Sequence, residues 1–213
     1  MPLLPANAVI DFIVQGGPIM YPIVVVCLVA VCLITERTLW WIKLARQRNA
    51  ALQDQVFAAL ECGQVDKAIT LSATSTDPVV RMLHHGLIHN HSSMQGALEV
   101  AAGAELRKAG RFLPAMDTII TLGPLLGLLG TVTGIMGSFT SIGSAELAVT
   151  KVTGGIGEAL IATAAGLGAA IVTLVPMNHF HSRLSSLQFD LETAASNALI
   201  LAARHGFDAA PAK

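Results

Sequence analysis

The stretch TLGPLLGLLGTVTGIMGSF, residues 121–139, decides what kind of protein this chain forms. It holds five glycines among leucines, threonines and one proline. A phosphate-binding P-loop needs a lysine after its glycines, and residues 112–150 contain no lysine. The dinucleotide-binding pattern G-x-G-x-x-G is also missing from residues 121–139. The stretch therefore favours a helix over a nucleotide-binding loop.

The glycines of this stretch recur with a helical period. They stand at Gly123, Gly127, Gly130, Gly134 and Gly137. At about 100° per residue, all of them fall within roughly 40° of one line along a helix. A second set of small residues follows the same period, at Gly155, Ala159, Ala162 and Gly166. Small residues at this spacing let membrane helices approach closely, so we expect the two helices to pack tightly, against each other or against a neighbouring subunit.

The composition supports a membrane location. The chain has 213 residues, of which 53% are hydrophobic and only 13% are charged, whereas a soluble domain averages about 25% charged residues. A membrane-spanning helix needs about 20 mostly apolar residues, and residues 18–38, 113–140 and 153–178 qualify. We predict an all-α membrane protein with three transmembrane helices. The net charge of −1 gives no indication of nucleic-acid binding.

The lysines and arginines that flank the spans predict the orientation. Eight of them lie on one side: Arg37, Lys43, Arg46, Arg48, Arg107, Lys108, Arg111 and Arg183. Lys151 alone lies on the other side. Because positive residues concentrate on the cytoplasmic side, residues 1–17 and the short loop 141–152 are predicted to lie outside. Residues 39–112 and 179–213 are predicted to be cytoplasmic and helical. The N-terminus has no basic residue before Arg37, so we do not expect a cleaved signal peptide.

Two of the spans are expected to extend as long helices into the cytoplasmic region. One helix is predicted from about Ser93 into the second span, and another continues from the third span past residue 178, with apolar residues every three or four positions. The pair Glu36 and Arg37, at the inner end of the first span, is interpreted as an anchor in the lipid headgroups.

Four polar residues within the spans are candidates for function. Glu158 is the strongest, since ionisable residues inside spans are rare and usually face a bundle interior or water; a wetted glutamate at the membrane interface is the alternative. Thr131 and Thr163 lie beside the two stripes of small residues, although a threonine hydroxyl can simply bond the carbonyl one turn back. Asp117 lies near the inner end of its span, where a boundary role is sufficient. No acid lies near the middle of a span, so a proton relay needs either Glu158 or an acid from a partner chain.

Three stretches together resemble one known family. They are GGPIMYPIVVVCLVAVCLITER at 16–37, GPLLGLLGTVTG at 123–134 and GGIGEALIATAAGLGAAI at 154–171. The chain is similar to the MotA/TolQ/ExbB proton-channel family, and most similar to its ExbB branch. The resemblance implies a homopentamer in the bacterial inner membrane whose pore holds helices of a single-span ExbD- or TolR-like partner. Proton flow would then energise a TonB-like protein, and the protonatable aspartate would belong to the partner. By the same resemblance, Thr131 and Thr163 would line the pore and Glu158 would be the glutamate of the third span.

Other functions are less well supported by the sequence. His84, His85, His89 and His91 cluster along 84–91, but no nearby cysteine or acid completes a metal site, so no metal or other cofactor is expected. No catalytic arrangement of residues is found, and we do not expect an enzyme. A TolQ-like subunit of envelope maintenance and an oligomeric membrane scaffold that conducts no ions remain alternatives to an ExbB-like subunit.

Overall fold

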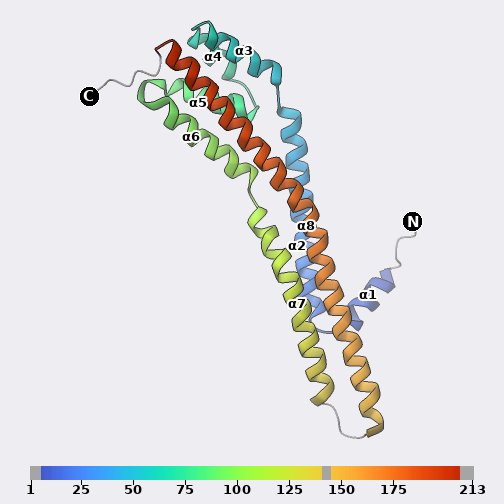
Figure 1. Cartoon of the computed structure of the whole chain (residues 1–213). Coiled ribbons are helices and arrows are strands. Elements are labelled where there is room, and N and C mark those ends of the chain that lie inside the picture. The colour runs from blue at the N-terminus through green and yellow to red at the C-terminus, as the bar shows by residue number, and fades with distance from the viewer. Residues whose placement is uncertain (1–5, 141–144, 207–213) are drawn as a thin grey trace. The chain divides into compact units, whose positions relative to one another are not determined.

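Helices make up all of the secondary structure in the computed structural model, which describes residues 6–140 and 145–206. Their bounds are α1 Ala6–Gln15, α2 Met20–Gln47, α3 Ala50–Glu61, α4 Val65–Ser72, α5 Pro78–Ile88, α6 Asn90–Ala109, α7 Leu113–Thr140 and α8 Ala145–Arg204 (Figure 1). Within these two described ranges no strand occurs. The predicted all-α fold is confirmed.

Among the described residues, three helical stretches are long and apolar enough to cross a membrane. They lie within Met20–Gln47, Ser93–Phe139 and Val152–Arg204. Each of them overlaps one of the predicted spans, so the number of spans is confirmed. Helix α1 was not predicted. It precedes the first span and ends at Gln15.

The chain divides into two compact units. Unit 1 consists of Met1–Arg37 and Phe112–His179, and unit 2 consists of Thr38–Arg111 and Phe180–Lys213. Unit 1 contains most of each predicted span. Unit 2 contains the segments that the sequence predicts to be cytoplasmic.

In unit 1, α7 and α8 run antiparallel with their backbones close together (Figure 1). A Cβ atom added to Gly123 would lie 2.7 Å from the carbonyl oxygen of Gly166, and one added to Gly127 would lie 2.9 Å from the Cα atom of Thr163. Atoms that are not bonded cannot approach so closely, so these positions need glycine. The small residues that face the other helix in this way are Gly123, Gly127, Gly130 and Gly134 on α7, and Gly155, Ala159, Ala162 and Gly166 on α8.

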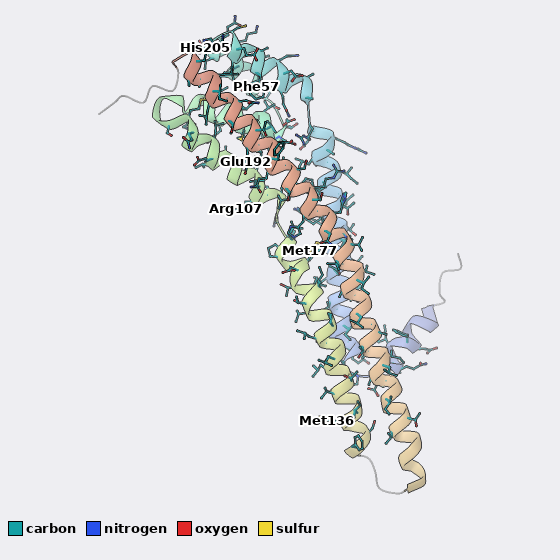
Figure 2. The ribbon with its side chains drawn as sticks, in the orientation of Figure 1. Phe57, Arg107, Met136, Met177, Glu192 and His205 are labelled. Carbon is teal, nitrogen blue, oxygen red and sulfur yellow. The ribbon has the colours of Figure 1, made fainter. Side chains whose placement is uncertain are left out.

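Unit 2 has a hydrophobic core of the kind found in soluble helical bundles. Helix α5 contributes Met82 and Leu83, which are fully buried. The C-terminal part of α8 adds residues spaced three or four apart, namely Leu187, Leu191, Ala194, Ala198 and Ala202. This spacing places them on one face of the helix. At the end of α8, the Nε2 atom of His205 lies 3.0 Å from the carbonyl oxygen of Glu61, the last residue of α3 (Figure 2).

The prediction of an unbroken helix from Ser93 into the second span is wrong. Helix α6 ends at Ala109 with Gly110 as its C-cap, and α7 begins at Leu113. Between them, Phe112 has a φ of 69°, in the left-handed region that ends helices. Pro114 therefore stands in the first turn of α7, where its missing N–H costs no hydrogen bond. The helices that extend beyond the predicted spans are α2, which continues to Gln47, and α8.

Asp77 connects several elements of unit 2 although its side chain is completely buried. It is the N-cap of α5, where its Oδ1 atom accepts hydrogen bonds from the backbone N–H groups of Val79 at 2.8 Å and Val80 at 3.4 Å. Its Oδ2 atom accepts from the backbone N–H of Asn49 at 2.7 Å and from the amide of Gln53 at 3.0 Å. The carboxylate thereby ties the start of α3 to the start of α5.

Adding one methyl group to the α7–α8 contact should destabilise the chain. A Cβ atom at Gly166 would overlap the carbonyl oxygen of Gly123, so we expect Gly166→Ala to lower the melting temperature in detergent by about 5 °C, from an overpacking cost of ~1–3 kcal/mol. Gly168→Ala is the matched control on the same helix, because a Cβ atom there meets nothing within 4 Å. The melting temperature is read by fluorescence-detected gel filtration after heating. Equal melting temperatures for the two variants would contradict the close contact.

Loss of the Asp77 carboxylate should destabilise unit 2 specifically. Asp77→Ala leaves buried donors without partners, and we expect it to cost about 2–4 kcal/mol. Asp77→Asn should cost less, because it keeps an acceptor for α5 but cannot accept from Asn49. Asp66→Ala, which changes an exposed acid in the first turn of α4, should change stability by less than about 0.5 kcal/mol. The rate of limited proteolysis within residues 49–90 of the full-length protein measures the stability of unit 2. Equal cleavage rates for Asp77→Ala and Asp66→Ala would contradict a stabilising role of the Asp77 carboxylate.

Candidate functional site

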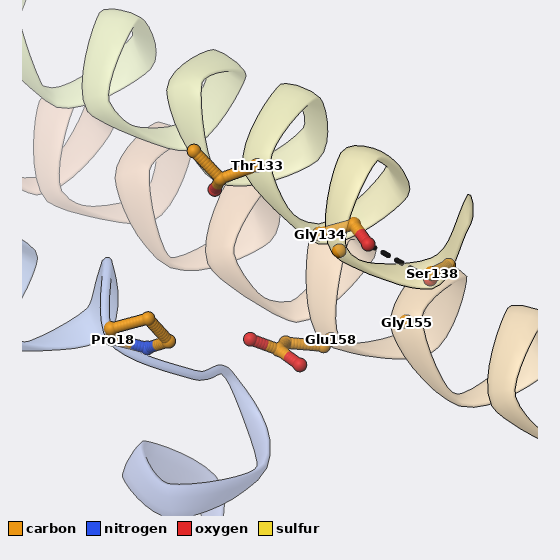
Figure 3. A pocket seen from close by; sticks show the side chains of 7 residues that line it. Pro18, Thr133, Gly134, Ser138, Gly155 and Glu158 are labelled. Carbon is orange, nitrogen blue, oxygen red and sulfur yellow. Dashed lines mark hydrogen bonds between the residues drawn. The ribbon is translucent and has the colours of Figure 1, made fainter. Parts of the chain in front are cut away.

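Glu158 lies on α8 and borders a pocket inside unit 1. The pocket has a volume of about 350 Å³ and is lined by Pro18, Thr133, Gly134, Gly137, Ser138, Gly155 and Glu158; we call it the Glu158 pocket. Figure 3 shows the carboxylate of Glu158 pointing toward Pro18, with Thr133 and Ser138 on the neighbouring helix α7. Among the described residues, none donates a hydrogen bond to this carboxylate or pairs with it as a cation.

The two hydroxyl groups of the pocket already donate their hydrogens elsewhere. Thr133 donates to the carbonyl oxygen of Leu129 at 2.9 Å, and Ser138 donates to that of Gly134 at 2.8 Å. A hydroxyl whose hydrogen is used offers only its lone pairs, and an ionised carboxylate is likewise only an acceptor. The side chains of the pocket therefore suit a bound cation, a proton donor or water.

Thr163 contacts α7 directly, on another part of the α7–α8 interface. Its hydroxyl oxygen lies 2.9 Å from the carbonyl oxygen of Gly127 on α7 and 3.1 Å from that of Ala159 on its own helix. With one hydrogen, the hydroxyl can donate to either carbonyl. The bond to Gly127 crosses between helices, and it is within reach only because the glycine brings the two backbones together.

Thr131 has a different environment from Thr163. Its hydroxyl donates to the carbonyl oxygen of Leu128, within α7, at 2.7 Å. Because Thr163 lies opposite Gly127, Thr131 is displaced from it by four residues, or about 6 Å along the helix. Neither threonine lines the Glu158 pocket. Within one chain, the structure therefore brings Glu158 together with Thr133 and Ser138, and not with Thr131 or Thr163.

Thr133 and Ser138 were missed by sequence reasoning, although a signal for Thr133 was present. Thr133 lies about 80° to one side of the glycine line on α7, and Glu158 lies about 60° to one side of the small-residue line on α8. When two antiparallel helices face each other, positions displaced in the same rotational sense share a flank. The antiparallel pairing of the stripes would have placed Thr133 beside Glu158. No comparable signal was available for Pro18, which comes from the turn before α2.

Neither Asp117 nor any of the histidines His84, His85 and His89 lines the Glu158 pocket, and the side chain of His91 lies outside the described residues. Asp117 is exposed on the first turns of α7. His84 lies 2.9 Å from the Ser72 hydroxyl, and the rings of His85 and His89 stack at 4.5 Å. In the described part of the chain, no group of three or more His, Cys, Asp or Glu side chains comes close enough to hold a metal ion.

The interpretation of Arg37 as a headgroup anchor is wrong, because its side chain is only 1% exposed within the protein. Its Nε and Nη2 atoms donate to the two carboxylate oxygens of Glu36, at 2.6 and 2.9 Å. The guanidinium also lies over the ring of Phe112, 5.6 Å from its centre. A buried arginine is costly unless it is paired, and the Glu36 carboxylate and the Phe112 ring contribute to offsetting that cost.

Three apolar helices of spanning length, two of them packed through small residues, define a multi-pass membrane protein. Residues 74–193, more than half of the chain, match the MotA/TolQ/ExbB proton channel family. The chain belongs to this family, as the resemblance of its motifs predicted.

Individual relatives agree with this membership. A protein of Synechocystis sp. named as the ExbB-like biopolymer transport protein 3 is 38% identical over 78% of this chain and 82% of its own length. The ExbB-like protein 1 of the same organism is 34% identical over 90% of this chain and 78% of its own length. The Tol-Pal system protein TolQ of Haemophilus influenzae is 34% identical over 54% of this chain and 51% of its own length.

Proposed function

We propose that this chain is a proton-channel and motor subunit of an energy-transducing complex in the bacterial inner membrane. It uses the proton motive force, together with an ExbD-like single-span partner, to energise a TonB-like protein for import across the outer membrane. Its own part in this function is structural and ionic: it forms the wall of the channel and supplies polar groups along it, and it needs no cofactor.

The observation that carries this proposal is the Glu158 pocket. It places a carboxylate with no hydrogen bond from the described residues beside two hydroxyls that present lone pairs. An ionisable side chain destabilises a membrane-spanning helix, so its presence there indicates a functional role. A site that offers only acceptors attracts a proton or another small cation. Thr163 and Thr131 are proposed to contribute oxygen atoms elsewhere along the ion pathway.

The lack of an acidic residue near the middle of any predicted span supports a partner chain. Asp117 lies near one end of α7 and Glu158 lies within the first turns of the third predicted span, so no acid of this chain lies near the middle of a span. A proton that crosses the membrane needs a second protonatable group, and a partner helix with an aspartate would supply it. Large apolar side chains exposed on α7, such as Leu125, Leu128 and Met136, leave surface for lipid, further copies or the partner. Figure 2 labels Met136 among them.

A homopentamer with periplasmic N-termini completes the proposal. The eight basic residues on one side against Lys151 on the other support the orientation, with the spans at 18–38, 113–140 and 153–178. The ExbB-like assignment is supported by the relatives that align over most of the chain. The TolQ relative aligns over about half of it, and a TolQ-like subunit remains the second candidate. A scaffold that only oligomerises would use the same stripes of small residues.

Replacing Thr163 with valine should reduce proton flux without preventing assembly. Valine keeps nearly the same volume but removes the hydroxyl, and we expect flux with the single-span partner in proteoliposomes to fall about tenfold, the effect of losing one hydrogen bond worth ~1.4 kcal/mol. Thr173→Val is the control, since that hydroxyl is buried on the same helix and bonds only within it. Thr163→Ser should retain flux. If Thr163→Val conducts like the unmodified chain, the hydroxyl has no role in the pathway.

Replacing Glu158 with glutamine should abolish most of the flux, because the amide cannot take up and release a proton. We expect a fall of at least about a hundredfold, the range for loss of a proton-transfer group. Glu192→Gln, an exposed acid on α8, is the control. Assembly is checked by gel filtration for every variant. A scaffold would instead show loss of assembly in each defective variant, and no variant that assembles but does not conduct.

A further inference from the structure

The turn between α1 and α2 lies directly against the carboxylate of Glu158. At the centre of this turn, Gly17 has a φ of 72°, a conformation that residues with a side chain rarely adopt. A Cβ atom added to Gly17 would overlap the carboxylate of Glu158. Glycine is therefore required here for two separate reasons, the backbone conformation and the space that the acid occupies.

The turn is fixed to α8 close to Glu158. The backbone N–H of Met20 donates to the carbonyl oxygen of Gly17 at 3.1 Å. Met20 and Ile23 of α2 are buried in a cluster with Ala162, which lies one helical turn beyond Glu158 on α8. Ile13 of α1 packs against the same cluster. The turn is thus held from both of its sides, and it cannot retreat freely when a larger residue replaces Gly17.

The turn also forms one wall of the Glu158 pocket. Pro18 lines the pocket, and Figure 3 shows the Glu158 carboxylate lying between Pro18 and the side chains of α7. Because Gly17 has no side chain, the Glu158 carboxylate contacts the Gly17 backbone on one side and faces the pocket on the other. A methyl group at Gly17 would occupy the place of the carboxylate and force Glu158 into another rotamer, away from the pocket.

We propose that Gly17 is a positioning residue for Glu158: it holds the carboxylate in the pocket with Thr133 and Ser138, where an ion from the aqueous phase reaches it. This inference rests on the proposed function for its consequence, since the positioned carboxylate is the one assigned to the ion pathway. Its geometric part stands without that function. The two parts are therefore tested by separate measurements on the full-length chain.

Chemical labelling of Glu158 tests the positioning. The detergent-solubilised chain reacts with a water-soluble carbodiimide and glycine ethyl ester, and peptide mass spectrometry follows Glu158, with the exposed Glu192 as internal reference. We expect Gly17→Ala to slow labelling of Glu158 about tenfold, a rate ratio that corresponds to ~1.4 kcal/mol. Glu192 should react at an unchanged rate.

Two matched variants separate the overlap from other effects of alanine. Gly157→Ala adds a methyl group next to Glu158 on α8 but meets nothing within 4 Å. Gly63→Ala imposes the same backbone strain, at a φ of 73°, and its nearest atom is 3.4 Å away, on His205. Both should label Glu158 at the rate of the unmodified chain. Equal labelling of the Gly17→Ala variant and the unmodified chain would overturn the proposal, as would equal slowing in Gly157→Ala.

A second variant covers the case in which Gly17→Ala does not fold. Combining Gly17→Ala with Glu158→Ala removes the group that the new methyl overlaps, so folding judged by gel filtration should return. Gly63→Ala, which has the same backbone strain but no overlap, shows whether that strain alone is tolerated. If Gly63→Ala folds and the double variant does not, the proposal is wrong.

Proton flux with the partner then tests the consequence. If labelling and flux both fall in Gly17→Ala, the positioning and its role in the ion pathway are supported together. If labelling falls while flux is unchanged, Gly17 positions Glu158 but the ion role assigned to Glu158 is overturned. If flux falls while labelling is unchanged, the positioning is overturned and the proposed function is not.

Discussion

The close approach of the α7 and α8 backbones is the constraint on which the rest of unit 1 depends. Lipid gives apolar helices no reason to associate, since a leucine is as stable against an acyl chain as against another leucine. Van der Waals contact between the two backbones stabilises the pair instead of the hydrophobic effect. This contact requires residues without a side chain at positions 123, 127 and 166, which are all glycine. The hydrogen bond from Thr163 to the carbonyl of Gly127 is a consequence, because a carbonyl is within reach of a side chain on the other helix only where no Cβ atom intervenes.

The same antiparallel contact determines which polar groups become neighbours. Once Gly127 lies opposite Thr163, the positions on each flank of the two helices are fixed. Glu158 then shares a flank with Thr133, and the end of α7 brings Ser138 to the same pocket. Both hydroxyls donate their hydrogens to carbonyl oxygens of α7, so the side chains of the pocket offer only oxygen lone pairs. A site of this chemistry follows from helix register, with no loop or cofactor.

One buried charged group in each unit is satisfied by contacts within the protein. In unit 2, the buried carboxylate of Asp77 accepts four hydrogen bonds, from four different residues, and serves stability. In unit 1, the buried Arg37 is paired with Glu36 and covered by Phe112. Glu158 has neither arrangement among the described residues. That difference separates polar groups that hold the fold together from a carboxylate that lines a pocket.

The sequence by itself determined the helical class, the number of spans and the residues able to form a close helix contact, because hydrophobic length and a period of 3.6 residues are local properties. It also singled out Glu158, since a lone acid in an apolar helix is visible without coordinates. Only the tertiary structure decided what surrounds that acid. The register of α7 against α8 chose Thr133 and Ser138 over Thr131 and Thr163, and the return of the chain before α2 set Gly17 against the carboxylate. The burial of Arg37 was likewise beyond the sequence. These arrangements depend on contacts between residues far apart in the chain, and no local pattern encodes them. The break at Phe112 differs, because Gly110 before it and Pro114 after it are local signals of a helix end and a helix start.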